Sequence, residues 1–425
     1  MVKDFNLSKE ADIGYYVGFL GSSFCFAQFL TASFWGYLSD RFGRRPVILM
    51  ALLGNSLSLL MFGVSKSLAW AITARLACGL VNGTIGVAKS LLGEITDSTN
   101  RSRAFSLMSL NFGVGTVIGP ALGGLLANPA EKYPDIFGHI DFLKEYPYFL
   151  PCFCSAIITW IGFTLGYFFL PETCTTVVGY QRVEDQIAAP SHLESSNEEE
   201  VDIDGNNEAV DQTTEPQSTG LGAAAISSIF SYSILAFSDV YFAECFPLWA
   251  VTQPTIGLGF DGGQIGIAFT VCGTIMLFNQ LIIYPEVAKR TTTKQLYQIS
   301  TIVLIIFPLM FPLISNYVAG NANLRWLLWP TLLFTMGLRT ITNGFLFTSI
   351  FVLITVSAKG GQLGTVNGIA HAAASLTRTF APTVGGISFA WSLQNGLPPP
   401  LNHLFIFTTL TVVSILLAIQ TYFML

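Results

Sequence analysis

The sequence predicts an all-α polytopic membrane protein built from two pseudo-symmetric helical bundles, and three observations lead to that prediction. The 425 residues are 52% hydrophobic and only 11% charged, whereas soluble domains carry about 25% charged residues. Eleven apolar runs have the length of a membrane-crossing helix, about 20 residues. Short motifs also recur at one displacement in the two halves. We therefore expect little of the surface to face water.

The apolar runs form two groups, separated by a polar segment. Five precede this segment, at 13–38, 47–64, 67–91, 104–127 and 148–170. Six follow it, at 222–250, 262–284, 297–318, 325–355, 365–391 and 403–424. The expected organisation is a first bundle over 1–170, a linker over 171–220 and a second bundle over 221–425.

The linker carries most of the negative charge of the chain. Residues 171–220 hold twelve Asp or Glu and one Arg, while the whole chain has 26 acidic and 20 basic residues. Such a segment buries too little apolar surface to fold, so we expect a disordered tether. Because the acidity belongs to the tether, it says nothing about basic or nucleic-acid partners.

The connection between the first two runs sets the expected orientation. Residues 36–46 contain two glycines, an aspartate and three arginines, namely Gly36, Asp40, Arg41, Gly43, Arg44 and Arg45. A charge buried in hydrocarbon costs several kcal/mol, so this connection must lie at a membrane surface. With the amino terminus outside, ten basic residues lie on the inner side and six on the outer. Lys and Arg favour the cytosol, so we expect this connection, the linker and the carboxyl terminus to be cytosolic.

Two features repeat between the halves at nearly the same displacement. Gly119-Pro120-Ala121-Leu122-Gly123-Gly124 recurs 262 residues later as Ala381-Pro382-Thr383-Val384-Gly385-Gly386, and Arg75 is matched 264 residues later by Arg339. Parallel duplicated halves are one architecture of secondary transporters. The same displacement places the partner of 222–250 upstream of Met1. We therefore expect eleven spans of a twelve-span design; a truncated isoform or gene model and a genuine eleven-span protein both stay open.

Four segments of the first half resemble the major facilitator superfamily of transporters. They are the connection 36–46, the Arg-x-x-x-Gly pattern at 75–79, the glycine-rich sequence 115–124, and the charged segment from Glu94 and Asp97 to Arg101 and Arg103. The resemblance implies two six-helix bundles that alternate access to a central site.

A narrower resemblance is to the zinc-induced-facilitator-like subfamily, which is related to tetracycline-resistance antiporters. The residues that carry it lie at 13–19, 34–36, 128–134, 244–250 and 367–370. The resemblance implies a proton-coupled carrier of a small organic solute or metal chelate, in a vacuolar or plasma membrane. Two departures weaken zinc as the specific substrate. The cysteine motif expected before the second span is absent, and Cys174-Thr175-Thr176 stands where a histidine is expected.

One group of motif residues is expected to control conformation. A carboxylate at Asp40 is favoured near the amino-terminal end of a helix at Gly364–Thr365 by about 0.3–1 kcal/mol, and this contact would close the inner face. The alternative is that the arginines only retain the connection in the cytosol. Small residues permit close helix packing, and proline kinks a helix. The group comprises Gly36, Asp40, Arg41, Gly43, Arg44, Arg45, Gly115, Gly119, Pro120, Gly123 and Pro382.

Polar and ionisable residues inside the runs are the candidates for proton coupling or substrate binding. Asp239 and Glu244 diverge by about 140° around a helix, so they cannot face one point. One is expected to bind a proton or cation; the alternative is structural pairing with Arg339 or Arg378. His371 is a candidate for titration near neutrality, or is merely hydrogen-bonded. The whole set is Arg75, Asp239, Glu244, Arg339, Asn343, His371 and Arg378.

The sequence therefore predicts a monomeric secondary transporter, with proton-coupled antiport as the first hypothesis. An uncoupled facilitator or a symporter on the same fold is the second, and a non-transporting form that regulates a full-length sibling is the third. We find no nucleophile–base set, metal-ligand spacing or nucleotide-binding loop. We accordingly expect no enzyme activity, no cofactor, no metal site and no use of ATP.

Overall fold

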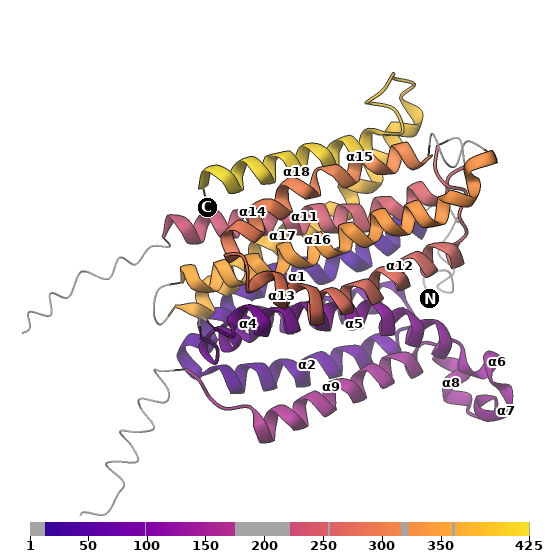
Figure 1. Cartoon of the computed structure of the whole chain (residues 1–425). Coiled ribbons are helices and arrows are strands. Elements are labelled where there is room, and N and C mark those ends of the chain that lie inside the picture. Colours follow the sequence, from indigo (N-terminus) through magenta and orange to yellow (C-terminus); the bar gives the residue numbers. More distant parts are fainter. Residues whose placement is uncertain are drawn as a thin grey trace, which may run out of the picture.

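Long helices lie side by side as roughly parallel rods in the computed structural model, which describes residues 13–97, 99–174, 222–253, 256–315, 322–358 and 362–424 (Figure 1). Consecutive rods run in opposite directions. We call the end of the bundle at which the first helix ends, beside Gly43, the Gly43 end, and the other the far end.

The described residues of the first half form five rods and three short helices. The rods are α1 (Ile13–Phe42), α2 (Arg44–Gly63), α3 (Leu68–Asn82) continued by α4 (Ile85–Glu94), α5 (Arg101–Leu126) and α9 (Phe149–Phe169). The short helices α6 (Pro129–Lys132), α7 (Pro134–Phe137) and α8 (Asp141–Glu145) connect α5 to α9 at the far end.

In the second half, the residues that the structure describes form six rods. They are α11 (Ala223–Val251); α12 (Gly262–Phe278) with the π-helical turn η3 (Asn279–Ile283) and α13 (Tyr284–Ala288); α14 (Thr293–Leu304) with α15 (Ile306–Leu313); α16 (Leu328–Ser357), preceded by the 3₁₀ turn η5 (Ala322–Leu327); α17 (Leu363–Gln394); and α18 (Phe405–Met424). Pro285 lacks the N–H for a regular helical bond, which accounts for the wider turn before it.

Each of the eleven predicted runs is covered by one rod, so the all-helical fold class is confirmed. Eight rods of the described residues are long and apolar enough to cross a membrane. The other three, α1, α5 and α17, all take part in the contact between the two halves. Because these three helices face the opposite half as well as lipid, their sequences are richer in Gly, Ser and Thr than that of a helix that faces lipid alone. That they cross the membrane remains a prediction.

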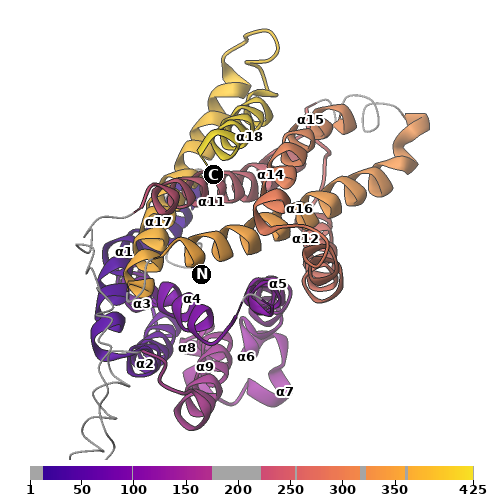
Figure 2. The same ribbon diagram turned by 60° about the vertical axis from the view of Figure 1, so that its left-hand side comes forward.

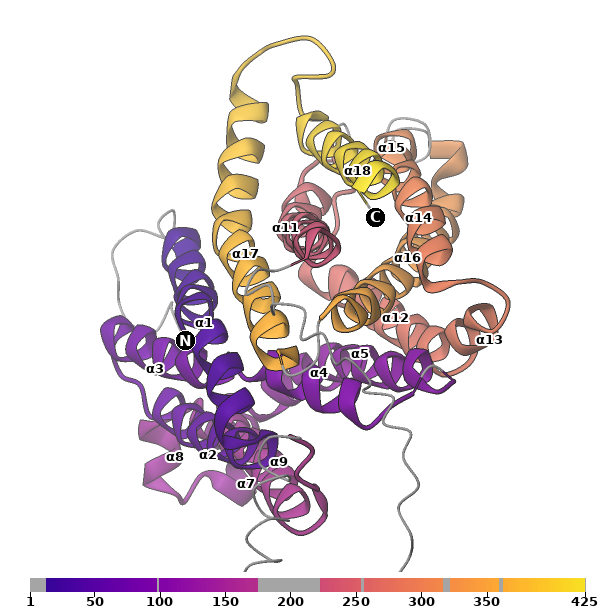
Figure 3. The same cartoon turned by 90° about the vertical axis from the view of Figure 1, so that its left-hand side faces the viewer.

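The two halves lie next to each other, seen end-on in Figure 3. One contact between them is made by α1 and α4 with α17, and the other by α5 with α12 and α16. Figure 2 shows α17 running beside α1 from the Gly43 end. Gly119 follows the start of α5, and Ala381 the start of α17, by 18 residues, so the repeated motifs occupy equivalent heights.

The connection predicted at 36–46 is much shorter than expected, which corrects the sequence analysis. Helix α1 continues to Phe42 and α2 begins at Arg44, so Gly43 alone joins them. Gly43 has a φ of 102°, a conformation that side chains disfavour, so glycine is required there. Gly36 lies inside α1 and is not part of a turn.

Most of the predicted linker, residues 175–220, lies outside the described residues. Its first four residues, 171–174, are described and pack against the Gly43 end of the first half, with Cys174 only 4% exposed. Glu172 binds the start of α2, and the predicted division of the chain into two bundles and a linker stays a prediction.

Candidate functional site

Asp40 closes the Gly43 end by binding the first turn of α17. Its Oδ1 accepts a hydrogen bond from the backbone N–H of Gly364 (2.9 Å). Its Oδ2 accepts from the backbone N–H of Thr365 (2.7 Å) and from the Thr365 hydroxyl (2.6 Å). The carboxylate thus satisfies N–H groups that a helix start leaves free, at the positive end of its dipole. The contact expected from the sequence is present, and it joins the two halves.

Glycines allow α1 and α17 to approach closely behind this contact. A Cβ added to Gly36 would collide with the carbonyl oxygen of Gly364, and one added to Gly368 would lie 2.7 Å from the carbonyl oxygen of Ala32. On α4, a Cβ at Gly86 would lie 3.0 Å from the carbonyl oxygen of Asn367. The backbones of three helices from both halves therefore meet with no side chain between them.

Buried polar side chains continue this contact toward the far end. Ser90 of α4 donates to the carbonyl of Leu363 (2.9 Å), and the Asn367 amide donates to Ser90 (3.1 Å). Nearer the far end, the Ser375 hydroxyl donates to the Gln28 side chain (3.0 Å), and Gln28 is 3% exposed. Hydrogen bonds of this kind hold the halves together and can exchange partners when the halves move.

Arg44 supports the Asp40 carboxylate from the first half. It is 2% exposed, and its guanidinium lies 2.6 Å from Asp40 and 2.7 Å from Glu94. It also donates to the Ser39 hydroxyl (2.7 Å). A buried guanidinium is tolerated because two carboxylates and a hydroxyl surround it. The arginine therefore positions Asp40 and ties α2 to the end of α4.

Glu172 is a further member of this cluster, to which the sequence analysis assigned no role. Its carboxylate accepts hydrogen bonds from the backbone N–H groups of Arg44 (2.8 Å) and Arg45 (3.1 Å), and so caps α2 from outside the helix. Thr173 donates to Glu94 (2.5 Å), and the Cys174 thiol donates to the carbonyl of Asp40 (3.4 Å). The Arg44 N–H that Glu172 binds lies 128 residues away in the sequence, so no local pattern indicates this contact.

The other charged residues of this end have peripheral positions. Arg41 is exposed and has no ion-pair partner in the described part of the chain. Arg45 donates to the carbonyl of Tyr167 on α9 (2.5 Å). The hydroxyl and backbone N–H of Thr99 donate to Asp97, which lowers the pKa of that carboxyl. None of the three contacts α17, in contrast to Asp40.

The second contact between the halves involves α5, α16 and η3. The hydroxyls of Ser109 and Thr348 lie 2.9 Å apart, and Thr348 donates to the side chain of Gln280 (3.3 Å). A Cβ on Gly113 would lie 3.0 Å from Met276. The residues of α5 that make these contacts all belong to its half nearer the Gly43 end. Both contacts between the halves are therefore strongest toward this end.

The glycines predicted to pack α5 closely do not do so, which is a second correction. No described atom lies within 4 Å of a Cβ placed on Gly115, Gly119 or Gly123. In the second half the equivalent stretch of α17 packs on α11, where a Cβ added to Gly385 would lie 3.0 Å from the Cys245 sulfur. The surroundings of Pro120 lie outside the described side chains, and α17 continues through Pro382.

The acidic residues of α11 have different surroundings. Asp239 lies 3.6 Å from the Arg339 guanidinium on α16, and the Asn343 amide donates to the same carboxylate oxygen (2.5 Å). Arg339 also lies over the Phe242 ring, 3.5 Å from its centroid. Glu244 is exposed, with no ion-pair partner in the residues that the structure describes. Asp239 thus adopts the pairing that the sequence analysis held as the alternative, and Glu244 does not.

Lys89 is the polar residue of the interior that sequence reasoning missed. It lies on α4, is 2% exposed, and donates to the Tyr232 hydroxyl of α11 (3.4 Å). Arg378 of α17 donates to the same hydroxyl (3.3 Å). His371, two turns before Arg378, is 1% exposed, and neither ring nitrogen has a described hydrogen-bond partner. A lysine inside a predicted span was a sufficient signal, by the reasoning applied to Arg75.

Arg75 lies apart from this cluster, within the first half. Its guanidinium lies over the rings of Phe24 on α1 and Phe62 on α2, at 5.3 and 5.7 Å from their centroids. Cation–π contacts stabilise a partly desolvated arginine. The residue therefore has aromatic neighbours rather than an ion pair, and it makes no described contact with the second half.

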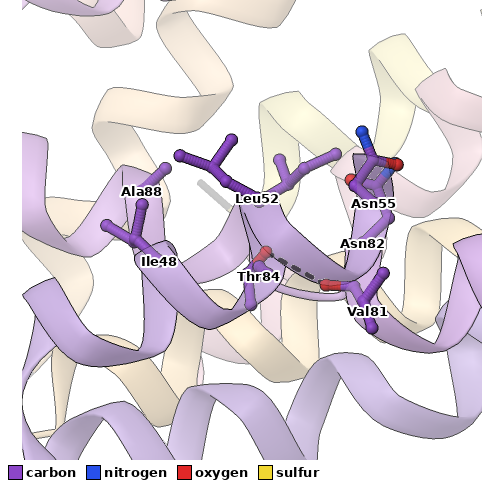
Figure 4. A pocket seen from close by; sticks show the side chains of 9 residues that line it. Ile48, Leu52, Asn55, Val81, Asn82, Thr84 and Ala88 are labelled. Atoms are coloured by element: carbon purple, nitrogen blue, oxygen red, sulfur yellow. Dashed lines mark hydrogen bonds between the residues drawn. The ribbon is translucent and has the colours of Figure 1, made fainter. Parts of the chain in front are cut away.

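A cavity of about 180 Å³ lies between α2 and the break between α3 and α4 (Figure 4). Asn55, Asn82 and Thr84 are its polar lining residues, and the remainder, including Ile48 and Leu52, is apolar. No charged side chain lines it. The ionisable residues cluster instead at the contact between the halves, which is where we place the candidate site.

The described contacts between the halves are uneven along the bundle. Toward the Gly43 end the halves meet through Asp40, the glycine contacts and Ser109. Toward the far end, Gly115, Gly119 and Glu244 are exposed. Two similar helical bundles with charged groups at their interface are one architecture of secondary transporters.

Comparison with known proteins gives the family. The sequence profile of the Major Facilitator Superfamily matches residues 1–382. The chain belongs to this superfamily. As a major facilitator superfamily transporter it is an integral multi-pass membrane protein, of a family that carries small solutes across the membrane, and not an enzyme. The resemblance inferred from its motifs is therefore confirmed.

Individual relatives and one solved structure refine this assignment. The chain is 30% identical over 432 residues to the protein Zinc Induced Facilitator 1 of Arabidopsis thaliana, covering 99% of this chain and 86% of the relative. It is 35% identical over 161 residues to the class C tetracycline resistance protein of Escherichia coli, covering 38% and 36% of the two chains. The structure of the proton:xylose symporter XylE superimposes with a TM-score of 0.66 at 14% identity, covering 99% of this chain and 88% of the other. The last comparison supports the fold alone.

Proposed function

We propose that this superfamily member is a proton-coupled antiporter of a small organic solute or metal chelate that works by alternating access. The contact of Asp40 with Gly364 and Thr365 carries the proposal. It seals one end with a few charge-assisted hydrogen bonds, which are strong enough to hold a closed state and few enough to break. With the arginine-rich Gly43 end in the cytosol, the end that Asp40 closes would be the cytosolic one.

Asp239 and Glu244 are the proposed proton-coupling residues. Protonation of Asp239 would remove the charge that pairs with Arg339 and accepts from Asn343. Glu244 lies in the exposed part of α11, where a proton can reach it from the far end. Two carboxylates on one helix, one paired and one exposed, suit a cycle in which a proton and a solute compete for the open state.

Relatives favour export over uptake. The names of two matched proteins describe a tetracycline resistance protein and an efflux pump. Resistance by a small-solute carrier requires transport out of the cytosol, and exchange for an entering proton supplies the driving force. We therefore favour antiport over symport.

The test uses the purified chain in proteoliposomes containing a pH-sensitive dye. A pH gradient is imposed across the membrane, and tetracycline or a Zn²⁺–citrate chelate is supplied on the side opposite the acidic compartment. We expect solute movement to accelerate proton flux in the opposite direction. Solute movement that ignores the gradient would indicate a facilitator, and proton flux in the same direction a symporter. If neither solute moves, the proposed substrate class is wrong.

Coupling is tested with Asp239→Asn and Glu244→Gln. We expect loss of gradient-driven transport in at least one variant, while exchange of solute without a gradient persists. Asp135→Asn, in the exposed helix α7, is the matched control. If both variants retain full gradient-driven transport, these carboxylates do not couple proton movement.

A further inference from the structure

Two cations lie close together at the contact between the halves, with no carboxylate in contact with them. Lys89 comes from the first half, and its Nζ lies 3.6 Å from the ring centroid of Phe351 and 4.6 Å from that of Tyr232. Arg378 comes from the second half, with its guanidinium 5.7 Å from the Tyr232 centroid. Neither side chain forms an ion pair within the described residues.

Tyr232 joins these cations and leaves one donor unused. Its phenol oxygen accepts from Lys89 at 3.4 Å and from Arg378 at 3.3 Å. Among the described residues, nothing accepts the proton of this hydroxyl, and Tyr232 is 1% exposed. A phenol O–H that receives two cationic donors is a strengthened donor itself. The cluster therefore offers an ammonium, a guanidinium and a hydroxyl as donors, and among the described residues no carboxylate accepts a hydrogen bond from them.

The charges of the surrounding helices do not balance this cluster. Asp239 of α11 attracts Arg378 electrostatically, but its direct ion pair is with Arg339 of α16. The ring nitrogens of His371 on α17 have no described hydrogen-bond partner, and this residue interacts electrostatically with both Lys89 and Arg378. With the histidine neutral, the three cations and one carboxylate leave two excess positive charges. Buried charges are normally paired, and cation–π contacts repay only part of the desolvation of an ammonium.

We propose that Lys89, Arg378 and Tyr232 bind the anionic group of the transported solute, a carboxylate or phosphate oxygen. This inference rests on the proposed transport function and specifies its substrate class. Because α4 belongs to one half and α11 and α17 to the other, the anion would contact both halves at once. Binding and release of the anion would therefore change how strongly the two halves are held together at this interface.

Thermal unfolding of the detergent-solubilised full chain tests the proposal without any gradient. The probes are acetate, benzoate and phenyl phosphate, compared with acetamide, benzamide and phenol at equal concentration and ionic strength. A ligand that binds only the folded state raises the unfolding midpoint. We expect at least one anion, and none of its neutral analogues, to raise the midpoint. Benzoate and phenyl phosphate separate carboxylate from phosphate recognition.

Variants make the assignment specific. Lys89→Met removes an unpaired buried cation, so we expect the midpoint without ligand to rise by about 2–4 °C, and the anion effect to disappear. Arg339→Met is the matched control, since it removes a paired cation and should lower the midpoint. If Lys89→Met does not accumulate, Arg378→Met gives the same comparison.

The proposal is overturned if no anion stabilises the wild-type chain, if neutral analogues stabilise it equally, or if the anion effect survives in Lys89→Met and Arg378→Met. The transport assay is read separately. Specific stabilisation by anions without transport would contradict only the proposed transport function. Unchanged transport of a neutral solute by Lys89→Met would contradict only the anion subsite.

Discussion

Asp40 and Thr365 lie 325 residues apart in the sequence and share two hydrogen bonds at one carboxylate oxygen. The backbone N–H of Thr365 and its hydroxyl both donate to Asp40 Oδ2, so the side chain of one half binds the helix start of the other. The negative charge of Asp40 therefore helps to hold the two halves together at the Gly43 end.

Asp40→Asn should open the Gly43 end. The change removes the charge that interacts with the α17 start and Arg44, a loss of about 1.5–3 kcal/mol, or roughly ten- to a hundredfold in the equilibrium between closed and open. Buried Cys174 lies against Asp40. In a chain whose other cysteines are replaced by alanine, maleimide should label Cys174 about tenfold faster or more.

The matched control for that experiment is Asp97→Asn. Asp97 lies at the same end but accepts its hydrogen bonds from the neighbouring Thr99 and Asn100. Because these bonds lower its pKa, Asp97 contributes to stability at neutral pH and loses that contribution as pH falls through the lowered pKa. Labelling should be unchanged in Asp97→Asn. Equal acceleration in both variants would mean that Asp40 has no specific closing role.

Gly36→Ala should separate α1 from α17, since its new methyl group would collide with the Gly364 carbonyl. Overpacking of this kind costs about 1–3 kcal/mol, so both the unfolding midpoint and transport should fall. Gly119→Ala is the comparison, because its methyl group enters open space. There alanine should stabilise the helix by about 0.5–1 kcal/mol. Equal destabilisation by both substitutions, measured by thermal unfolding, would contradict this packing.

Glu172→Ala should weaken the start of α2. The carboxylate caps the N–H groups of Arg44 and Arg45, and loss of a capping side chain costs about 1 kcal/mol. Hydrogen exchange at the first turn of α2 should accelerate severalfold. Glu131→Ala, on the exposed helix α6, is the control and should leave that exchange unchanged. Unaltered exchange in Glu172→Ala would show that the segment after α9 merely rests on the bundle.

Asp239→Asn should destabilise the second half, because it leaves Arg339 buried without its counter-charge. The side chains of Arg339 and Asp239 are 12% and 28% exposed, so we expect a loss of about 1–3 kcal/mol, the cost of leaving a largely desolvated polar group without its partner. The double variant Asp239→Asn with Arg339→Met should recover most of that loss, since neither charge remains. A double-mutant cycle of unfolding free energies measures the coupling. Additive losses would place the two residues in independent environments.

Much of the architecture could be predicted from sequence because hydrocarbon imposes local rules. A bilayer requires about 20 apolar residues per helix, so eleven rods were located to within a few residues at most of their ends. The position of Asp40 could be predicted as well. A carboxylate and a free helix start have complementary charge, and the contact expected between Asp40 and the helix start at Gly364–Thr365 is present.

The residues at the candidate site were predicted less well. Lys89 sits in an apolar run, and nothing local reveals that Tyr232 and Arg378 share its surroundings. The glycines of α5 suggested close packing, yet the structure uses Gly36, Gly364 and Gly368 for that purpose. A glycine pattern shows that another helix can pack closely against a given helix. Whether one does so depends on how the neighbouring helices are arranged.

The sequence by itself determined the membrane-embedded helices, their grouping into two related halves and the superfamily, because hydrophobic length and repeated motifs are properties of the chain alone. Only the tertiary structure decided that Asp239 pairs with Arg339 while Lys89 and Arg378 remain without a carboxylate. Which charges balance depends on distances between helices that are remote in sequence, and no local pattern encodes those distances.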